Sequence, residues 1–165
     1  MEAVILIGIQ GSGKSTFYRS TFFDTHVRIS LDLLKTRHRE RLFLQACLDT
    51  RQPFAVDNTN VRAADRALYI GAAKRAGFRV KGYFLVSSLQ DALRRNRQRT
   101  GRAMIPVAGV VSAHKRLEPP TWTEGFDELY TVTQDDAGRF EVAPMTHESA
   151  ARDEDMAAPP GGPER

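Results

Sequence analysis

The sequence predicts an α/β fold in which a parallel sheet of about five strands carries helices on both faces. Two observations lead to this prediction. Along most of the chain, segments with the apolar, β-branched character of buried strands alternate with segments of helical periodicity, an order typical of parallel sheets. A glycine-rich loop also joins the first such strand to the first such helix, and loops of this kind lie at the carboxyl edge of parallel sheets.

The first half of the chain supplies three strands and three helices. Its strands are short apolar runs bounded by turn residues, and the first is apolar throughout, as in a strand buried on both faces. They are expected at residues 4–9, 27–30 and 54–57. The helices have apolar residues at helical spacing, and the last is closed by Gly77. They are expected at residues 14–22, 33–50 and 62–76.

The second half continues the alternation. Strands are expected at residues 79–87 and 129–133, and helices at 89–99 and 106–117. The domain is expected to span residues 1–142. Residues 143–165 are rich in small residues, Pro, Gly and charge, and cannot bury enough apolar surface to offset ordering, so we expect a disordered tail.

Composition favours a soluble protein with a polyanionic partner. The chain of 165 residues is 41% hydrophobic and carries a formal net charge of +4. From residue 144 onward five acids outweigh two arginines, which leaves about +7 for the remainder. No apolar run reaches the ~20 residues of a membrane helix, and we expect no signal peptide. The single cysteine, Cys47, allows no internal disulfide and favours a cytoplasmic location.

Residues 8–15 read Gly-Ile-Gln-Gly-Ser-Gly-Lys-Ser and fit the pattern G-x-x-x-x-G-K-[ST]. Its glycines let backbone N–H groups approach phosphate oxygens, and the following helix points its positive end at them. In this P-loop pattern Lys14 reaches the β- and γ-phosphates and the Ser15 hydroxyl ligates Mg²⁺. The sequence therefore predicts a P-loop NTPase with ATP and Mg²⁺ as cofactors. The residues expected to hold the nucleotide from this loop are Gly8, Gln10, Gly11, Ser12, Gly13, Lys14, Ser15 and Thr16.

The motif alone does not name the phosphate acceptor, because GTPases, ATPases and kinases share it. No N-K-x-D motif for guanine is present. A kinase needs a carboxylate that accepts the acceptor's proton, and Asp32 is the candidate because it follows the second expected strand. Helix capping by Ser30 or Asp32 explains the same residues equally well. Asp57 ends the third strand as a Walker-B acid would, and it also suits a turn begun with Asn58; the two roles are compatible.

An arginine-rich segment follows the fourth expected strand. Five arginines occur in the nine residues 94–102, and Arg95 and Arg99 lie four apart, on one helical face. Such a pair can clamp the β- and γ-phosphates as charge develops on them. A solvated basic face is the ordinary alternative. Lids of the adenylate-kinase kind lie at this position, which favours a lid by fold analogy.

Taken in order, five segments resemble the 5′-hydroxyl kinase domain of polynucleotide kinases, of both phage and animal kinds. They are the P-loop, ISLDLLK, AVDNTNVRAADRALYI, RRNRQRTGRAMIP and LEPPTWTEGFDEL, and they cover about residues 3–133. The P-loop is generic, but the ordered set is specific. The resemblance implies transfer of the γ-phosphate of ATP to the 5′-hydroxyl end of DNA or RNA.

The resemblance also implies roles for individual residues. Lys14, Asp32 and Arg99 would be catalytic, and Arg95 would clamp the donor phosphates together with Arg99. Asp32 would activate the 5′-hydroxyl, and Asp57 would support the acceptor side of the site. Lys35 stands where the phage pattern has an arginine that touches the substrate's phosphate, a departure that Arg37 or Arg39 could offset. The chain has no D-x-D-x-T phosphatase motif.

Two other functions fit the same motifs. A P-loop kinase of a small metabolite or nucleotide-sugar, including zeta-toxin-like enzymes, would need a compact acceptor pocket rather than a basic groove. A non-catalytic, nucleotide-dependent binding module is the other alternative. The intact set of site residues argues against it, namely Lys14, Ser15, Asp32, Arg95 and Arg99. Trp122 and Phe126 could stack on a base, but packing against the core explains them more simply.

Overall fold

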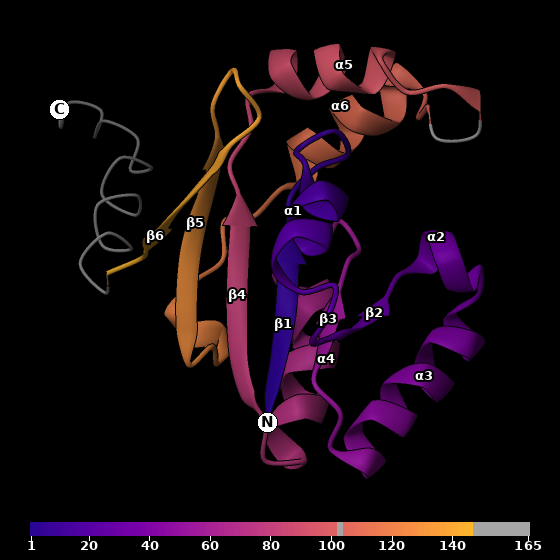
Figure 1. Ribbon diagram of the computed structural model, residues 1–165, viewed down its shortest axis with the longest axis vertical. Coiled ribbons are helices and arrows are strands. Elements are labelled where there is room, and N and C mark those ends of the chain that lie inside the picture. Colours follow the sequence, from indigo (N-terminus) through magenta and orange to yellow (C-terminus); the bar gives the residue numbers. More distant parts are fainter. Residues whose placement is uncertain (102–103, 147–165) are drawn as a thin grey trace, which may run out of the picture.

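The computed structural model describes residues 1–101 and 104–146. At its centre is a six-stranded sheet in the order β2-β3-β1-β4-β5-β6 (Figure 1). The strands are β1 (Glu2–Ile7), β2 (Val27–Ile29), β3 (Phe54–Val56), β4 (Arg79–Leu85), β5 (Glu128–Gln134) and β6 (Phe140–Pro144). The first five run parallel, as the sequence predicts, and β6 pairs antiparallel with β5.

Helices connect the strands and cover both faces of the sheet. They are α1 (Lys14–Thr21), α2 (Leu31–Leu34), α3 (Arg37–Thr50), α4 (Ala63–Arg75), α5 (Leu89–Arg97) and α6 (Val107–Arg116), with a short 3₁₀ helix, η2 (Trp122–Glu124), before β5. In Figure 1, α5 and α6 lie beyond the carboxyl ends of the strands, whereas α3 lies beside β2 at the sheet's edge. None of the helices in the described ranges combines the length and the apolar character needed to span a bilayer.

Alternate residues of β1 enter two different cores, because successive side chains of a strand point to opposite faces. Ile5 and Ile7 belong to the core under α3 and α4, whereas Val4 and Leu6 pack with Phe17 of α1. All four β1 side chains are fully buried. This explains why the strand reads as a continuous apolar run, and it fixes the loop after β1 at the centre of the carboxyl edge.

One expected helix is broken in the structure. Residues 33–50 were predicted as a single helix, but the chain forms the one-turn helix α2 and then α3. Lys35 ends α2 with φ 71°, and the side chain of Thr36 caps α3 by accepting a hydrogen bond from the Arg39 amide. A lysine in the left-handed region is uncommon, so the helical spacing of apolar residues gave no sign of the break.

The carboxyl-terminal part also differs from expectation. Strand β6 was not predicted, and it includes residues 143 and 144, which the prediction assigned to a disordered tail. Strand β6 has only five residues, and most of them are exposed at the sheet's edge, so its apolar pattern is too short to mark a strand by itself. Residues 147–165, the rest of the expected tail, lie outside the described residues.

Candidate active site

The P-loop joins β1 to α1, and its shape requires glycine at two positions. Gly11 and Gly13 have φ angles of 80° and 98°, a region that residues with a Cβ atom rarely adopt. A Cβ atom on Gly11 would lie 2.3 Å from the carbonyl oxygen of Ala92 in α5. The loop therefore passes directly against α5, the helix predicted to carry the lid arginines.

The loop presents polar groups that suit an anion. The Ser12 hydroxyl is buried and has no hydrogen-bond partner within the described residues, so it can donate to a phosphate oxygen. Gly13 is the N-cap of α1 and offers no side-chain cap, so the first amides of that helix are open toward the loop. The positive end of α1 lies at the same place. These features fit the triphosphate of ATP, with the loop residues as its holders.

Lys14 is buried at the centre of the loop. Its ammonium group donates hydrogen bonds to the carbonyl oxygens of Gly8 at 2.7 Å and Ile9 at 2.8 Å. Burial lowers the pKa of Lys14 to about 8, an effect that the negative charge of Asp57 opposes. Arg99 lowers this pKa further, and Asp32 raises it. The charges of Asp32, the predicted base, and of Arg99, the predicted lid arginine, therefore both change the pKa of Lys14.

A cluster of three polar side chains lies beside the P-loop, at the carboxyl edge of the sheet. It consists of Ser15, Arg28 and Asp57. The Ser15 hydroxyl donates to Asp57 Oδ2 at 3.0 Å, and Arg28 of β2 donates to the same oxygen from Nε at 2.9 Å and from Nη2 at 2.5 Å. The Arg28 guanidinium also donates to Ser15 Oγ at 3.1 Å. A hydroxyl and a carboxylate are oxygen ligands of the kind Mg²⁺ prefers. These two side chains fit Mg²⁺, with Ser15 as the residue that would hold it.

Asp32 is the second residue of α2 and lines a cleft beside the P-loop. Neither Ser30, the N-cap of α2, nor Asp32 makes a side-chain capping bond to this helix. The acceptor for its first amide is instead the side chain of Asn58, whose Oδ1 lies 2.9 Å from the Leu31 nitrogen. The capping alternative for Asp32 is therefore wrong, and the Asp32 carboxylate, exposed on the cleft wall, is left to face the cleft.

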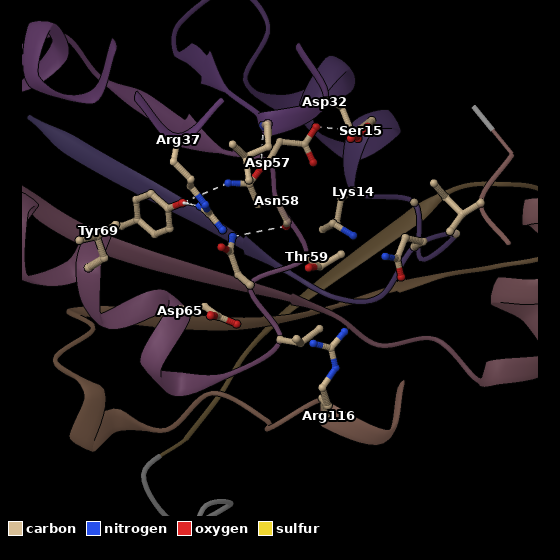
Figure 2. Close-up of a pocket in the computed structure, with 18 of the residues that line it drawn as sticks. Lys14, Ser15, Asp32, Arg37, Asp57, Asn58, Thr59, Asp65, Tyr69 and Arg116 are labelled. Carbon is tan, nitrogen blue, oxygen red and sulfur yellow. Dashed lines mark hydrogen bonds between the residues drawn. The ribbon is translucent and has the colours of Figure 1, made fainter. Parts of the chain in front are cut away.

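This first cleft has a volume of about 560 Å³. Its P-loop end is lined by Lys14, Ser15 and Asp57, with Asp32 on one wall (Figure 2). Further lining residues come from α3, α4 and α6. They are Arg37, Ala64, Asp65, Leu68, Tyr69 and Arg116. Besides its phosphate-binding end, the cleft therefore has two further arginines and exposed apolar surface among its lining residues.

The lid helix packs onto the P-loop. Arg95 donates from Nη1 to the Gly11 carbonyl oxygen at 3.3 Å and to Ser87 Oγ at 3.2 Å. Helix α5 ends at Arg97, two residues earlier than predicted, so Arg99 follows the helix rather than extending its face. Arg99 nevertheless lines the first cleft. Arg102, the last arginine of the run, lies outside the described residues.

A second cavity, of about 620 Å³, lies on the other side of the lid arginines. Gly11, Gly13 and Arg99 line both this cavity and the first cleft. The remaining walls are formed by α1, by α5 with its C-cap, and by the end of β5 with the β5–β6 turn. These residues are Thr16, Arg94, Arg95, Gln98, Gln134, Asp135, Asp136 and Gly138. The P-loop and Arg99 therefore form part of the wall of both spaces.

Not every predicted site residue reaches the clefts. Lys35 lines neither of them, and its ammonium donates to the Asp32 carbonyl oxygen instead. Arg37, two residues later, lines the first cleft. Phe126 is buried in the main core and Trp122 packs against that core, in agreement with the packing explanation. The aromatic pair is thus not part of either cleft.

Sequence reasoning missed four polar residues that the structure places in or beside the site. Arg28 donates to the Asp57 carboxylate, and Glu40 accepts a hydrogen bond from the Asn58 amide. Arg66 and Asn96 donate to backbone carbonyl oxygens of neighbouring loops. Asn96 is buried, and it exchanges two hydrogen bonds with the backbone of Ile105 across the lid segment. One signal was available: Arg28 interrupts the short apolar strand between Val27 and Ile29.

Several features together define a P-loop kinase fold. They are the sheet order, the P-loop, the carboxylates after β2 and β3, and the arginine-bearing helix α5. A family model described as an AAA domain (AAA_33) matches residues 4–120, and the chain belongs to this family. Among curated proteins, the bifunctional polynucleotide phosphatase/kinase of Schizosaccharomyces pombe is 28% identical over 135 residues, which are 79% of this chain. The match covers 33% of that protein, so the chain spans about a third of its relative's length.

Solved structures share the fold at lower identity. Kti12 of Chaetomium thermophilum, in complex with ADP-AlF3, superposes with a TM-score of 0.64 at 16% identity, covering 82% of this chain and 92% of that one. A gluconokinase of Sinorhizobium meliloti gives a TM-score of 0.58 at 20% identity, covering 80% of this chain and 82% of that one. These likenesses establish the fold and leave the acceptor to be argued from the site.

Proposed function

We propose that the chain is an ATP-dependent polynucleotide 5′-hydroxyl kinase. The observation that carries the proposal is the first cleft, where Asp32 and Arg99 lie on the walls around Lys14, and which Arg37 and Arg116 also line. An acceptor whose hydroxyl lies at Asp32 would bring its own negative charges to those two arginines. The 28% identity to a polynucleotide phosphatase/kinase supports a nucleic-acid end as that acceptor.

In the proposed reaction the acceptor oxygen attacks the γ-phosphorus of ATP while its proton passes to the Asp32 carboxylate. The new P–O bond forms as the bond from the γ-phosphorus to the β–γ bridging oxygen breaks, and ADP leaves. A positioned general base contributes about 10²–10⁴-fold to such a step. Lys14 and Arg99 would stabilise the charge that develops on the transferring group. Mg²⁺, held by Ser15 with support from Asp57, would neutralise charge on the β- and γ-phosphates.

Arg37, which lines the first cleft, rather than Lys35 would meet the substrate's phosphate. Arg37 binds Glu40 through Nη1, and its side chain is 63% exposed, so the rest of its guanidinium can face a ligand. Arg116 lies at the end of α6, and the Leu68 side chain supplies apolar surface for a terminal sugar or base. A planar guanidinium suits a phosphate better than an ammonium group does.

A transfer assay tests this proposal. The purified chain is incubated with Mg²⁺ and γ-labelled ATP, with 5′-hydroxyl DNA and RNA oligonucleotides, and in parallel with a pool of small hydroxyl metabolites. Lys14→Ala and Asp32→Ala are the test variants. Asp24→Ala is the matched control, because Asp24 is exposed in the α1–β2 connection and lines neither cleft.

The three possible results separate the candidate functions. Label on oligonucleotide 5′ ends that both test variants lose and the control keeps supports the proposal, and it ranks DNA against RNA. Label only in the metabolite pool keeps the P-loop kinase but moves the acceptor to a small molecule. ATP binding without transfer to either pool leaves a nucleotide-dependent binding module and overturns the proposal.

A further inference from the structure

A buried carboxylate lies behind the acceptor end of the first cleft. Glu40 of α3 is 1% exposed, and its two oxygens accept hydrogen bonds from three different elements. Arg37 donates to Oε2 at 2.8 Å, whereas Asn58 and the hydroxyl of Tyr69 each donate to Oε1 at 2.7 Å. Figure 2 shows Arg37, Asn58 and Tyr69 converging on one side of the cleft. A carboxylate is costly to bury unless it is paired in this way.

Asn58 connects this carboxylate to the helix that carries Asp32. Its Nδ2 group donates to Glu40 and, at 3.1 Å, to Tyr69, while its Oδ1 accepts the hydrogen bond from the Leu31 amide. The helix α2 has only four residues, and its own N-cap residue contributes no side-chain capping bond. A single turn is marginal by itself, so the cap from Asn58 helps to hold the helix that carries Asp32.

The network is fixed in one hydrogen-bonding pattern. Burial and then the neighbouring Glu40 raise the pKa of Tyr69 to about 12, so its hydroxyl stays protonated. With Tyr69 and Asn58 as donors to Glu40, the amide orientation of Asn58 is set, and its oxygen must point toward Leu31. The Asn58 side chain therefore joins α2 to α3 and α4 through hydrogen bonds.

Two consecutive residues after β3 serve the two halves of the site. The side chain of Asp57 bonds to Ser15 and Arg28 on the P-loop side. The side chain of Asn58 bonds to Leu31 on the Asp32 side. Because Asp57 and Asn58 are neighbours in the chain, they link the helix that carries Asp32 to the phosphate-binding loop.

We propose that Asn58 and Glu40 are positioning residues for Asp32, holding the one-turn helix α2 so that its carboxylate faces the acceptor hydroxyl. The role of Asp32 in this inference rests on the proposed function. Neither Asn58 nor Glu40 needs to touch the transferring group. Loss of either contact leaves the P-loop intact and displaces the base, and a displacement of about 1 Å in such a site can cost on the order of 100-fold in rate.

The test compares Asn58→Ala and Glu40→Gln with Asp49→Asn. The control replaces a carboxylate by an amide on the same helix, α3, at an exposed position that bonds to Gln45. Transfer to a 5′-hydroxyl oligonucleotide is measured to give kcat and the KM for both substrates, across pH. In parallel, hydrogen exchange of the Leu31 amide is followed without any acceptor.

We expect both test variants to lower kcat by about tenfold or more at every pH, with little change in the KM for ATP, and to speed exchange at Leu31. The control should match the wild type. Unchanged kcat, a loss confined to ATP affinity, or unchanged Leu31 exchange would overturn the inference. If Asn58→Ala does not fold, Glu40→Gln decides. If the wild type phosphorylates no 5′-hydroxyl, the proposed function fails, and the exchange measurement still shows whether Asn58 holds α2.

Discussion

The hydroxyl of Ser15 donates a hydrogen bond of 3.0 Å to Oδ2 of Asp57, although the two residues lie 42 positions apart in the chain. Ser15 belongs to the first turn of α1, and Asp57 follows β3. The same oxygen accepts two hydrogen bonds from Arg28. The Asp57 carboxylate is therefore held in one orientation by a hydroxyl and a guanidinium, at the place where P-loop proteins bind Mg²⁺.

Replacing Asp57 by Asn tests this relationship. The asparagine side chain keeps the shape of the aspartate, but it lacks the negative charge that attracts a divalent cation and holds Arg28. We expect activity to fall about 10–100-fold and the Mg²⁺ concentration for half-maximal activity to rise. A Mg²⁺ titration of transfer activity measures both, with Asp49→Asn as the exposed control. An unchanged Mg²⁺ dependence would contradict the assignment.

The lowered pKa of Lys14 predicts a pH-dependent affinity for ATP. With its pKa at about 8, Lys14 is charged at neutral pH and loses its proton above about pH 8 in the nucleotide-free protein. The phosphates of ATP favour the charged form, so binding takes up a proton at alkaline pH, and the affinity falls as pH rises through 8. Calorimetry between about pH 7 and pH 9.5, in buffers of different ionisation enthalpy, measures both effects.

The variant Lys14→Met provides the comparison for this titration. It removes the ionisable group while keeping an unbranched apolar stem in the buried position. We expect its ATP affinity to be low and nearly independent of pH over the same range. If wild type and variant showed the same pH dependence, another group would be responsible, and the assignment of the shift to Lys14 would fail.

The sequence predicted those parts of the fold and site that depend on local patterns. The continuous apolar run of β1, the glycine loop and the lysine that follows it lie close together in the chain, and each has a direct physical meaning there. The break between α2 and α3 was not predicted, because the apolar spacing continues across it and a lysine with positive φ is uncommon. Strand β6 was missed because an exposed edge strand needs no apolar face.

The missed site residues share a different cause. Glu40 lies in a helix where periodicity alone suggests a solvated charge, yet it is buried by partners 18 and 29 positions away. Asn96 similarly pairs with a backbone nine positions further along. Such partners are brought together only by the folded chain, so no spacing rule within one segment could identify them.

The lid arginines lead to a prediction about the donor phosphates. Arg99 lines both clefts, whereas Arg97, the last residue of α5, is exposed and lines neither. Arg99→Ala should lower kcat by about 100-fold or more, because it removes a charged donor placed where charge develops. Arg97→Ala should leave kcat within about twofold of the wild type. Steady-state transfer kinetics measure both, and equal effects would mean that the run acts through net charge alone.

Arg66 leads to a prediction about stability rather than activity. Its side chain is fully buried and forms a two-point ion pair with Glu124, with Nε to Oε2 at 2.6 Å and Nη2 to Oε1 at 2.7 Å. Nη1 also donates to the backbone carbonyl oxygens of Asn60 and Glu118. Arg66→Met should lower the free energy of unfolding by about 3–5 kcal/mol, because it leaves a carboxylate and two carbonyl groups without their partner. Urea unfolding measures this loss.

The double variant Arg66→Met/Glu124→Gln separates the ion pair from the backbone contacts. Removing the uncompensated charge should recover part of the stability lost in Arg66→Met, so the two single losses should not add. The exposed Arg75→Met on the same helix should change the free energy of unfolding by less than about 0.5 kcal/mol. If the double variant lost the full sum of the single effects, the pair would contribute nothing as a pair. Arg66 would then stabilise the loops around α4 only through the carbonyl oxygens of Asn60 and Glu118.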